Sequence, residues 1–115
     1  MAVVKITPEK LTHNTALTLK DATAMDATDG IYVEYTGKDH NIVMLLEGTA
    51  ADTVTVKMGN GLQGVADETV SLEADKPAAL VLESGRFKLV SGEYKGYVHL
   101  MGAATTTVRA FELPA

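Results

Sequence analysis

Strict alternation of apolar and polar residues is the strongest pattern along the chain. Residues 53–58 read Thr-Val-Thr-Val-Lys-Met, which places both valines and the methionine on one face. Successive side chains of a strand point to opposite faces, so this pattern predicts a half-buried strand. The same period recurs in five further segments: 31–35, 70–72, 80–82, 98–100 and 108–110. Residues 40–47 are apolar at consecutive central positions, which predicts a strand covered on both faces.

Glycine, aspartate, asparagine and proline residues separate these segments at intervals of about 8 to 15 residues. That spacing is too short for the crossover helices of βαβ units. One helical turn is expected at Thr7–Lys10, with Thr7 as its cap and Pro8 at the first helical position. We predict an all-β fold, an antiparallel β-sandwich or barrel of about eight short strands, either immunoglobulin-like or jelly-roll.

The first 28 residues are the least core-like part of the chain. After Val3, Val4 and Ile6, the stretch to Thr28 is rich in Thr, Ala, Asp and Lys. We treat residues 1–28 as an extended N-terminal strand, arm and loop that belong to the same domain as the β-sandwich of residues 29–115. Two interpretations stay open, a leading strand with a surface loop or an arm that adds a strand to a partner's sheet edge.

Composition and charge narrow the function classes. The chain has 115 residues, no Cys, ten Lys and Arg, fifteen Asp and Glu, and a net charge of −5. Without Cys there is no disulfide, no Cys-ligated zinc and no Cys nucleophile. The acidic balance disfavours nucleic acid as a partner. The longest apolar run, Ile42–Leu46, is far shorter than the roughly 20 residues of a membrane-spanning helix, and the first residues do not read as a secretory signal.

Two segments match known binding motifs, one for dinucleotides and one for calcium, but neither has the neighbouring residues that such a site requires. Residues 59–64 match G-x-G-x-x-G, but a dinucleotide site needs a helix at the third glycine, and here strand alternation resumes in residues 65–72. Asp26 and Asp29 lie in a faintly calcium-loop-like segment, but Thr28 and Gly37 stand where an EF-hand needs ligands. We therefore read both segments as turns.

Side chains for catalysis are also scattered. The three histidines, His13, His40 and His99, show no metal-ligand spacing, and none of the serines stands in Gly-x-Ser-x-Gly. We expect a protein that is not an enzyme, with no cofactor, no metal site and no small-molecule substrate.

Two tyrosines are candidates for an exposed aromatic surface. Tyr32 lies on the strand face opposite Ile31 and Val33, and Tyr97 on the face opposite Val98. Exposed tyrosines on a sandwich can form a sugar-binding platform or a protein interface, and partial burial at the rim of a sheet is the plainer interpretation.

The second half of the chain carries a family resemblance in four segments: residues 53–65, 82–88 (Leu-Glu-Ser-Gly-Arg-Phe-Lys), 95–98 (Lys-Gly-Tyr-Val) and 108–114 (Val-Arg-Ala-Phe-Glu-Leu-Pro). Over roughly residues 50–115 the chain resembles the small capsid decoration, or cement, proteins of tailed bacteriophages. The resemblance implies a virion structural protein made in the bacterial cytoplasm and carried on the capsid exterior. It also implies the major capsid protein as partner and a homotrimer as the usual assembly.

Within this resemblance, we expect partner contacts in the N-terminal segment and in two loops, Gly59–Gly64 and Ser84–Phe87. The residues concerned are Val3, Val4, Ile6, Asn60, Leu62, Arg86 and Phe87. Arg86 suits a bidentate contact with a carboxylate, although a surface ion pair is its plainer interpretation. The alternative function is a carbohydrate-binding or adhesin-like sandwich module of a fibre, tail or cell surface, based on Tyr32 and Tyr97.

Overall fold

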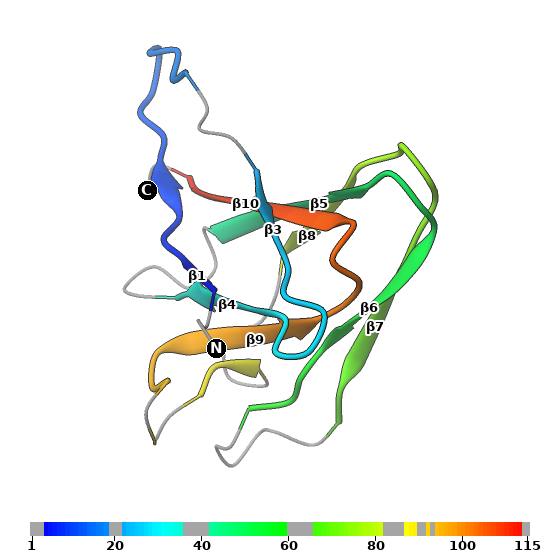
Figure 1. Cartoon of the computed structure of the whole chain (residues 1–115). Helices are drawn as coiled ribbons and strands as arrows, with labels where there is room; N and C mark the ends of the chain where they lie inside the picture. The colour runs from blue at the N-terminus through cyan, green and yellow to red at the C-terminus, as the bar shows by residue number, and fades with distance from the viewer. Residues whose placement is uncertain are drawn as a thin grey trace.

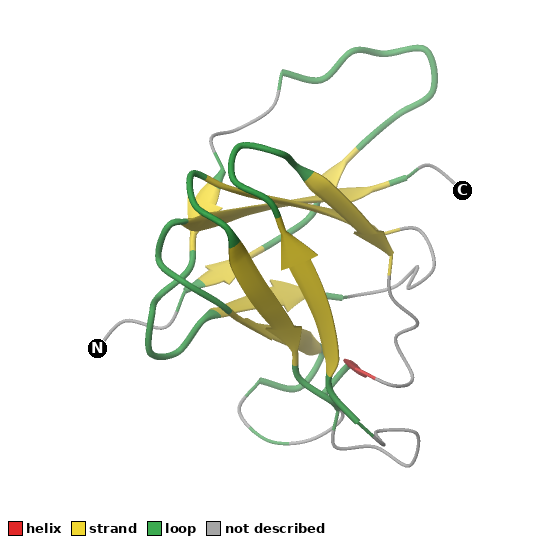
Figure 2. Ribbon diagram, turned by 90° about the vertical axis from the view of Figure 1, so that its right-hand side faces the viewer, coloured by secondary structure: helices red, strands yellow, loops and turns green. Residues whose placement is uncertain are grey.

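Ten strands make up the regular structure of the described chain. The computed structural model describes residues 4–18, 22–35, 42–59, 66–81, 87–89, 92 and 94–113. The strands are β1 (Lys5–Ile6), β2 (Glu9–Lys10), β3 (Thr23–Ala24), β4 (Ile31–Glu34), β5 (Ile42–Gly48), β6 (Asp52–Val56), β7 (Glu68–Leu72), β8 (Ala78–Val81), β9 (Tyr97–Met101) and β10 (Thr106–Glu112). They form two sheets (Figures 1 and 2), which confirms the predicted all-β sandwich.

Each sheet contains five strands. Sheet A has the order β1-β4-β9-β6-β7, and sheet B has the order β2-β10-β5-β8 with β3 also paired to β10. The pairings of β1 with β4 and of β2 with β10 are parallel, whereas the other named pairings are antiparallel. The sequence predicted an antiparallel sandwich, but the structure is mixed, because β1 and β2 at the edges of the two sheets pair in parallel.

All seven segments predicted from the sequence contain a strand, and β5 is the one whose burial differs from the prediction. Its inward residues Ile42, Met44 and Leu46 are fully buried. Val43 and Leu45 on its outer face are half-buried, so this strand is covered completely on one face only. The prediction of cover on both faces was wrong for the outer face, which has no second layer of described chain packed over it.

The hydrophobic core fills the space between the two inner faces. Alternate residues of β4, β6 and β9 meet those of β5 and β10, as the period of a strand requires. The buried apolar residues are Met25, Ile31, Val33, Tyr35, Ile42, Met44, Leu46, Val54, Val56, Leu72, Phe87, Val98, Leu100, Val108 and Ala110. Both sheets therefore contribute to one continuous core.

The N-terminal segment links the edges of both sheets, and we call residues 4–11 the strap. Tyr32 N donates to Val4 O at 2.9 Å where β1 joins sheet A, and Leu11 N donates to Glu112 O at 2.9 Å where β2 joins sheet B. The helical turn predicted at Thr7–Lys10 was wrong, because Glu9–Lys10 is a strand. Pairing with the edge of β10 satisfies backbone groups that a single isolated helical turn would leave open.

Asp52 holds the turn between β9 and β10. Its Oδ2 accepts hydrogen bonds from Ala103 N at 2.9 Å and from the Thr106 hydroxyl at 2.7 Å. Thr106 is completely buried, so Asp52 supplies the partner that a buried hydroxyl needs. The contact joins the start of β6 in sheet A to the start of β10 in sheet B.

These bonds also set the protonation of Asp52. Burial alone would raise its pKa, but hydrogen bonds from Ala103 N–H, the Thr106 hydroxyl and Thr53 N–H lower that pKa below the ordinary value of 3.8. Because the folded pKa is the lower one, the carboxylate stabilises the fold above pH 3.8. That stabilisation is lost as the pH falls through the folded pKa.

The core predicts different effects for two neighbouring leucines of β5. Leu46→Ala should lower the free energy of unfolding by about 2 to 5 kcal/mol, because it leaves a cavity between the sheets. Leu45→Ala, on the half-buried outer face, should cost clearly less. Urea denaturation followed by circular dichroism measures both, and equal losses would contradict the assignment of inner and outer faces.

Asp52→Asn should lower the free energy of unfolding by about 1 kcal/mol at neutral pH, because the charge-assisted hydrogen bonds weaken. The difference from the wild type should shrink as the pH falls from 3.8 through the lower pKa of the folded state, where the wild-type carboxyl also becomes neutral. Denaturation curves over this pH range test the prediction. Glu68→Gln, an exposed carboxylate on β7, is the matched control. A difference that stays constant down to acidic pH would show that the Asp52 charge is not responsible.

Candidate functional site

The outer face of sheet B carries an apolar row across three strands. Phe111 of β10, Val43 of β5 and Val81 of β8 lie in register. Val81 is 55% exposed, whereas the other two are half-buried. In the adjacent row, Leu45 and Ala79 extend the apolar surface, and Arg109 of β10 ends that row. We call these five residues, Val43, Leu45, Ala79, Val81 and Phe111, the apolar sheet-B face.

This face ends at an open strand edge. β8 is the last strand of sheet B, and within the described residues no strand pairs with its far side. An unpaired edge offers backbone donors and acceptors to another chain. The apolar sheet-B face and the β8 edge together form a surface suited to contact with a protein.

The outer face of sheet A carries a stack of three rings. The ring centroids of Tyr32 and Tyr94 are 4.1 Å apart, and those of Tyr32 and His99 are 4.2 Å apart. The ring planes differ by 16° and 4°, respectively. Tyr94 and His99 are both so close to Tyr32, and so nearly parallel to it, that they would overlap each other if they stacked on the same side of its ring. Tyr32 therefore lies between Tyr94 and His99, with both ring faces covered.

Two lysines stand at the ends of this stack. The Lys5 ammonium lies 5.2 Å from the Tyr94 ring centroid and 5.7 Å from that of Tyr97. On the other side, Lys57 N donates to His99 O at 2.9 Å, and the Lys57 ammonium pairs with Asp67 at 3.1 Å. We call Lys5, Tyr94, Tyr32, His99 and Lys57 the stacked row.

Hydrogen bonds orient the rings beside and within the stacked row. His99 Nε2 lies 2.7 Å from Asp29 O, and because a carbonyl oxygen only accepts, this nitrogen carries the proton. The Tyr97 hydroxyl donates to Glu34 Oε1 at 3.3 Å. Burial and the adjacent Glu34 carboxylate raise the pKa of Tyr97, so its hydroxyl stays protonated at neutral pH.

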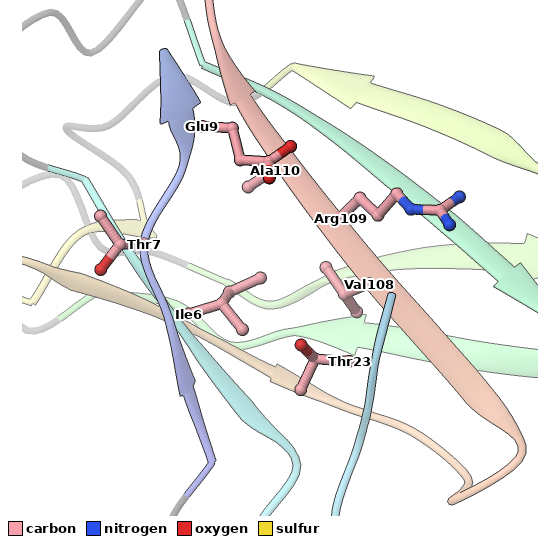
Figure 3. A pocket seen from close by; sticks show the side chains of 7 residues that line it. All are labelled: Ile6, Thr7, Glu9, Thr23, Val108, Arg109 and Ala110. Carbon is pink, nitrogen blue, oxygen red and sulfur yellow. The ribbon is translucent and has the colours of Figure 1, made fainter. Parts of the chain in front are cut away.

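A third feature is a cavity of about 280 Å³ between the strap and β10 (Figure 3). In Figure 3, Ile6 points from the strap toward Val108, whereas Arg109 points away on the other side of β10. The cavity lies where the edge of β10 passes from pairing with β3 at Val108 to pairing with β2 at Phe111.

The residues predicted as partner contacts are scattered in the structure. Val3, Asn60, Leu62 and Arg86 lie outside the described residues. Val4 and Ile6 are half-buried and pack against the core, and Ile6 also lines the cavity. Phe87 is only 3% exposed and belongs to the core, which leaves little of its ring for a partner.

Tyr32 and Tyr97 do lie together on the outer face of sheet A, but both are half-buried. Because both faces of the Tyr32 ring are covered, Tyr32 is not an open platform. Sequence analysis missed Lys5, Tyr94 and His99 as members of this surface. The alternation in residues 97–101 places Tyr97 and His99 on one face, but only strand pairing brings Tyr32 beside His99.

The two turn motifs have structural roles. A Cβ at Gly59 would lie 2.6 Å from Lys88 O, so glycine is needed for close approach of two backbone segments. The strand β7 follows this loop, as the sequence predicted. Asp26 Oδ2 accepts hydrogen bonds from Thr28 N at 2.9 Å and Asp29 N at 2.7 Å, which closes an Asx-type turn.

Comparisons with known proteins do not place the chain in a family, because no family model, no curated protein and no solved structure matches it. In the described part of the chain, no helix is long and apolar enough to cross a membrane. The same residues contain no group of three or more His, Asp or Glu side chains arranged to hold a metal ion. Function is therefore inferred from the surfaces of the sandwich.

Gly59→Ala should lower the free energy of unfolding by about 1 to 3 kcal/mol, because the added methyl group would overlap the backbone at Lys88. Thermal unfolding of the variant and of the wild type measures this loss. Adding a dinucleotide should leave the wild-type melting temperature unchanged. A dinucleotide-dependent rise that is absent in the variant would instead support a phosphate-binding role for the glycines.

Proposed function

We propose that the protein is a non-enzymatic virion structural protein that binds the outer surface of an assembled phage capsid and stabilises it. The observation that carries this proposal is the apolar sheet-B face beside the open β8 edge. The resemblance of residues 50–115 to capsid decoration proteins supports it. The major capsid protein is the proposed partner, and the capsid exterior is the proposed location.

The apolar sheet-B face suits a docking role because of what it exposes. Val81 is 55% exposed at the β8 end of an apolar row, although burial of such a side chain is favourable. A partner that covers Val81, Val43 and Phe111 removes this apolar area from water. An extended segment of the partner can in addition pair with the β8 edge.

Stabilisation of the capsid needs no chemical step. A protein that binds only the assembled, expanded shell shifts the equilibrium toward that state by mass action. The net charge of −5 favours solubility of the unbound copies. A chain without Cys must derive its rigidity from packing and from partners rather than from disulfides.

Three copies around a threefold position of the shell are the proposed assembly, on the basis of the resemblance alone. In such an arrangement, each copy contacts the shell and its neighbours. Avidity from several linked contacts would allow a modest individual interface to hold firmly.

Val81→Lys should abolish co-sedimentation with expanded capsids, because the substitution places a charge in the apolar row that docking would bury. It should also remove the rise in capsid disruption temperature that the wild type produces. Thr69→Lys, an exposed position on the outer face of sheet A, is the matched control and should bind normally. Circular dichroism and thermal unfolding of the free proteins establish that both variants are folded.

Three results would contradict different parts of this proposal. Failure of the wild type to sediment with expanded shells, or to raise their disruption temperature, rejects the capsid function itself. Normal binding by Val81→Lys together with loss of binding by Thr69→Lys would move the docking surface to sheet A. Sedimentation of the free proteins tests the trimer: if Val81→Lys becomes monomeric, the apolar sheet-B face joins copies of the chain rather than the chain and the shell.

A further inference from the structure

The strap is held by a short ladder at each end. Its pairing with β4 and its pairing with β10 each cover two residue pairs, whereas β5 and β10 pair over seven. Between the two ends lies the cavity of about 280 Å³, which Ile6 of the strap and Val108 of β10 both line (Figure 3). A void deprives its lining of dispersion contacts. The strap is therefore held less firmly than the central strands, and it can detach by local opening of the fold.

The segment that follows the strap is much longer than its course on this molecule requires. We call residues 12–22 the tether. Leu11 N bonds to Glu112 O and Thr23 pairs with Val108, so the two ends of the tether lie about 13 Å apart along one edge of β10. Fully extended, a tether of this length reaches about 40 Å, whereas the longest dimension of the molecule is 38 Å. The described part of the tether projects away from the sandwich (Figures 1 and 2).

Two exposed leucines lie on the tether and beside the strap. Leu17 of the tether is 43% exposed, and Leu113, which follows β10, is 42% exposed. Burial of such side chains is favourable. A strap that arrives from another copy brings its tether past Leu113, because Leu11 at the end of the strap bonds to Glu112. The contact between two copies thus covers apolar area that a single chain leaves in water.

We propose that neighbouring copies of this chain exchange their straps, so that each strap pairs with the sheet edges of the adjacent copy. An exchanged strap forms the same two ladders with β4 and β10. It also forms the same end bonds, from Tyr32 N to Val4 O and from Leu11 N to Glu112 O. Exchange of an identical element is a low-cost route to assembly, since the binding site already exists in every copy.

Strap exchange extends the proposed assembly of three copies, and its cyclic form rests on that assembly. When each strap crosses to the next copy around the ring, all three chains are joined through contacts that the fold already contains. The strap lies at the end of sheet B opposite β8, so exchange leaves the apolar sheet-B face and the β8 edge available for docking.

A disulfide between the strap and β10 distinguishes exchanged from unexchanged straps, because the chain has no Cys of its own. Lys10 and Glu112 are Cα partners on neighbouring strands, whose usual spacing of about 4.8 Å suits a disulfide. The full-length variant Lys10→Cys/Glu112→Cys is oxidised and analysed on a non-reducing denaturing gel. Exchange should give mainly covalent dimers and trimers, which return to monomers on reduction.

Thr53→Cys/Ser71→Cys is the matched control, since these two exposed residues are partners on β6 and β7 of one chain. It should give monomers, because its disulfide forms within the chain. A second variant lacks residues 13–17 in addition to carrying Lys10→Cys/Glu112→Cys. Its tether still spans the distance along β10 but reaches only about 23 Å, so most of the covalent dimers and trimers should disappear. Thermal unfolding establishes that all variants are folded.

Four results would overturn the proposal or a part of it. Monomers alone from Lys10→Cys/Glu112→Cys, in a protein that light scattering shows to be a trimer, would reject exchange and leave the trimer standing. A wild type that is monomeric at millimolar concentration would reject both. Equal amounts of covalent oligomer from the control would reveal random contact between chains. Undiminished oligomers after removal of residues 13–17 would exclude the role of the tether. Sedimentation with capsids is measured separately, so failure of exchange is distinguishable from failure of the capsid function.

Discussion

The pairing of β5 with β10 is the constraint on which the rest of the molecule depends. Their ladder runs without interruption from the Thr106–Gly48 pair to the Glu112–Ile42 pair. Strand side chains alternate, so this register decides which residues enter the core and which form the outer face. A slip of β5 by one residue would turn Glu47 inward and expose Met44. The buried core and the apolar sheet-B face are thus two consequences of one alignment.

Sheet A depends on the same rule, with a different result on its surface. The pairing of β4 with β9 buries Val33 against Val98 and places Tyr32 beside His99 on the outside. The strap then adds Lys5 from β1, and the turn before β9 adds Tyr94. Two sheets built on one period therefore present different chemistry, mainly apolar on the outer face of sheet B and aromatic, with charged groups of both signs, on the outer face of sheet A.

The N-terminal segment shows where local patterns stop being informative. Thr7 and Pro8 are a good beginning for a helix, yet Glu9 and Lys10 lie extended along β10. The reason is that the open edges of two sheets offer backbone partners that a short helix lacks. Residues 12–18 are exposed and contain no strand, as both the surface loop and the partner-docking arm would require. Local sequence patterns predict strands and turns, but they do not predict whether the strap or another surface contacts a partner.

Alternation in the sequence by itself determined the alternating strands and the inward side of each, because the hydrophobic effect acts on residues whose period is local. Examples are Val54 and Val56 of β6 and Val98 and Leu100 of β9, all fully buried. The continuous apolar run of β5 predicted a strand but not its inward side. Only the tertiary structure decided which outward residues become neighbours. His99 is far in sequence from Tyr32 and Lys5, and they meet because β9, β4 and β1 are adjacent in sheet A. Strand order depends on the packing of the whole chain, and for this reason no single segment could reveal it.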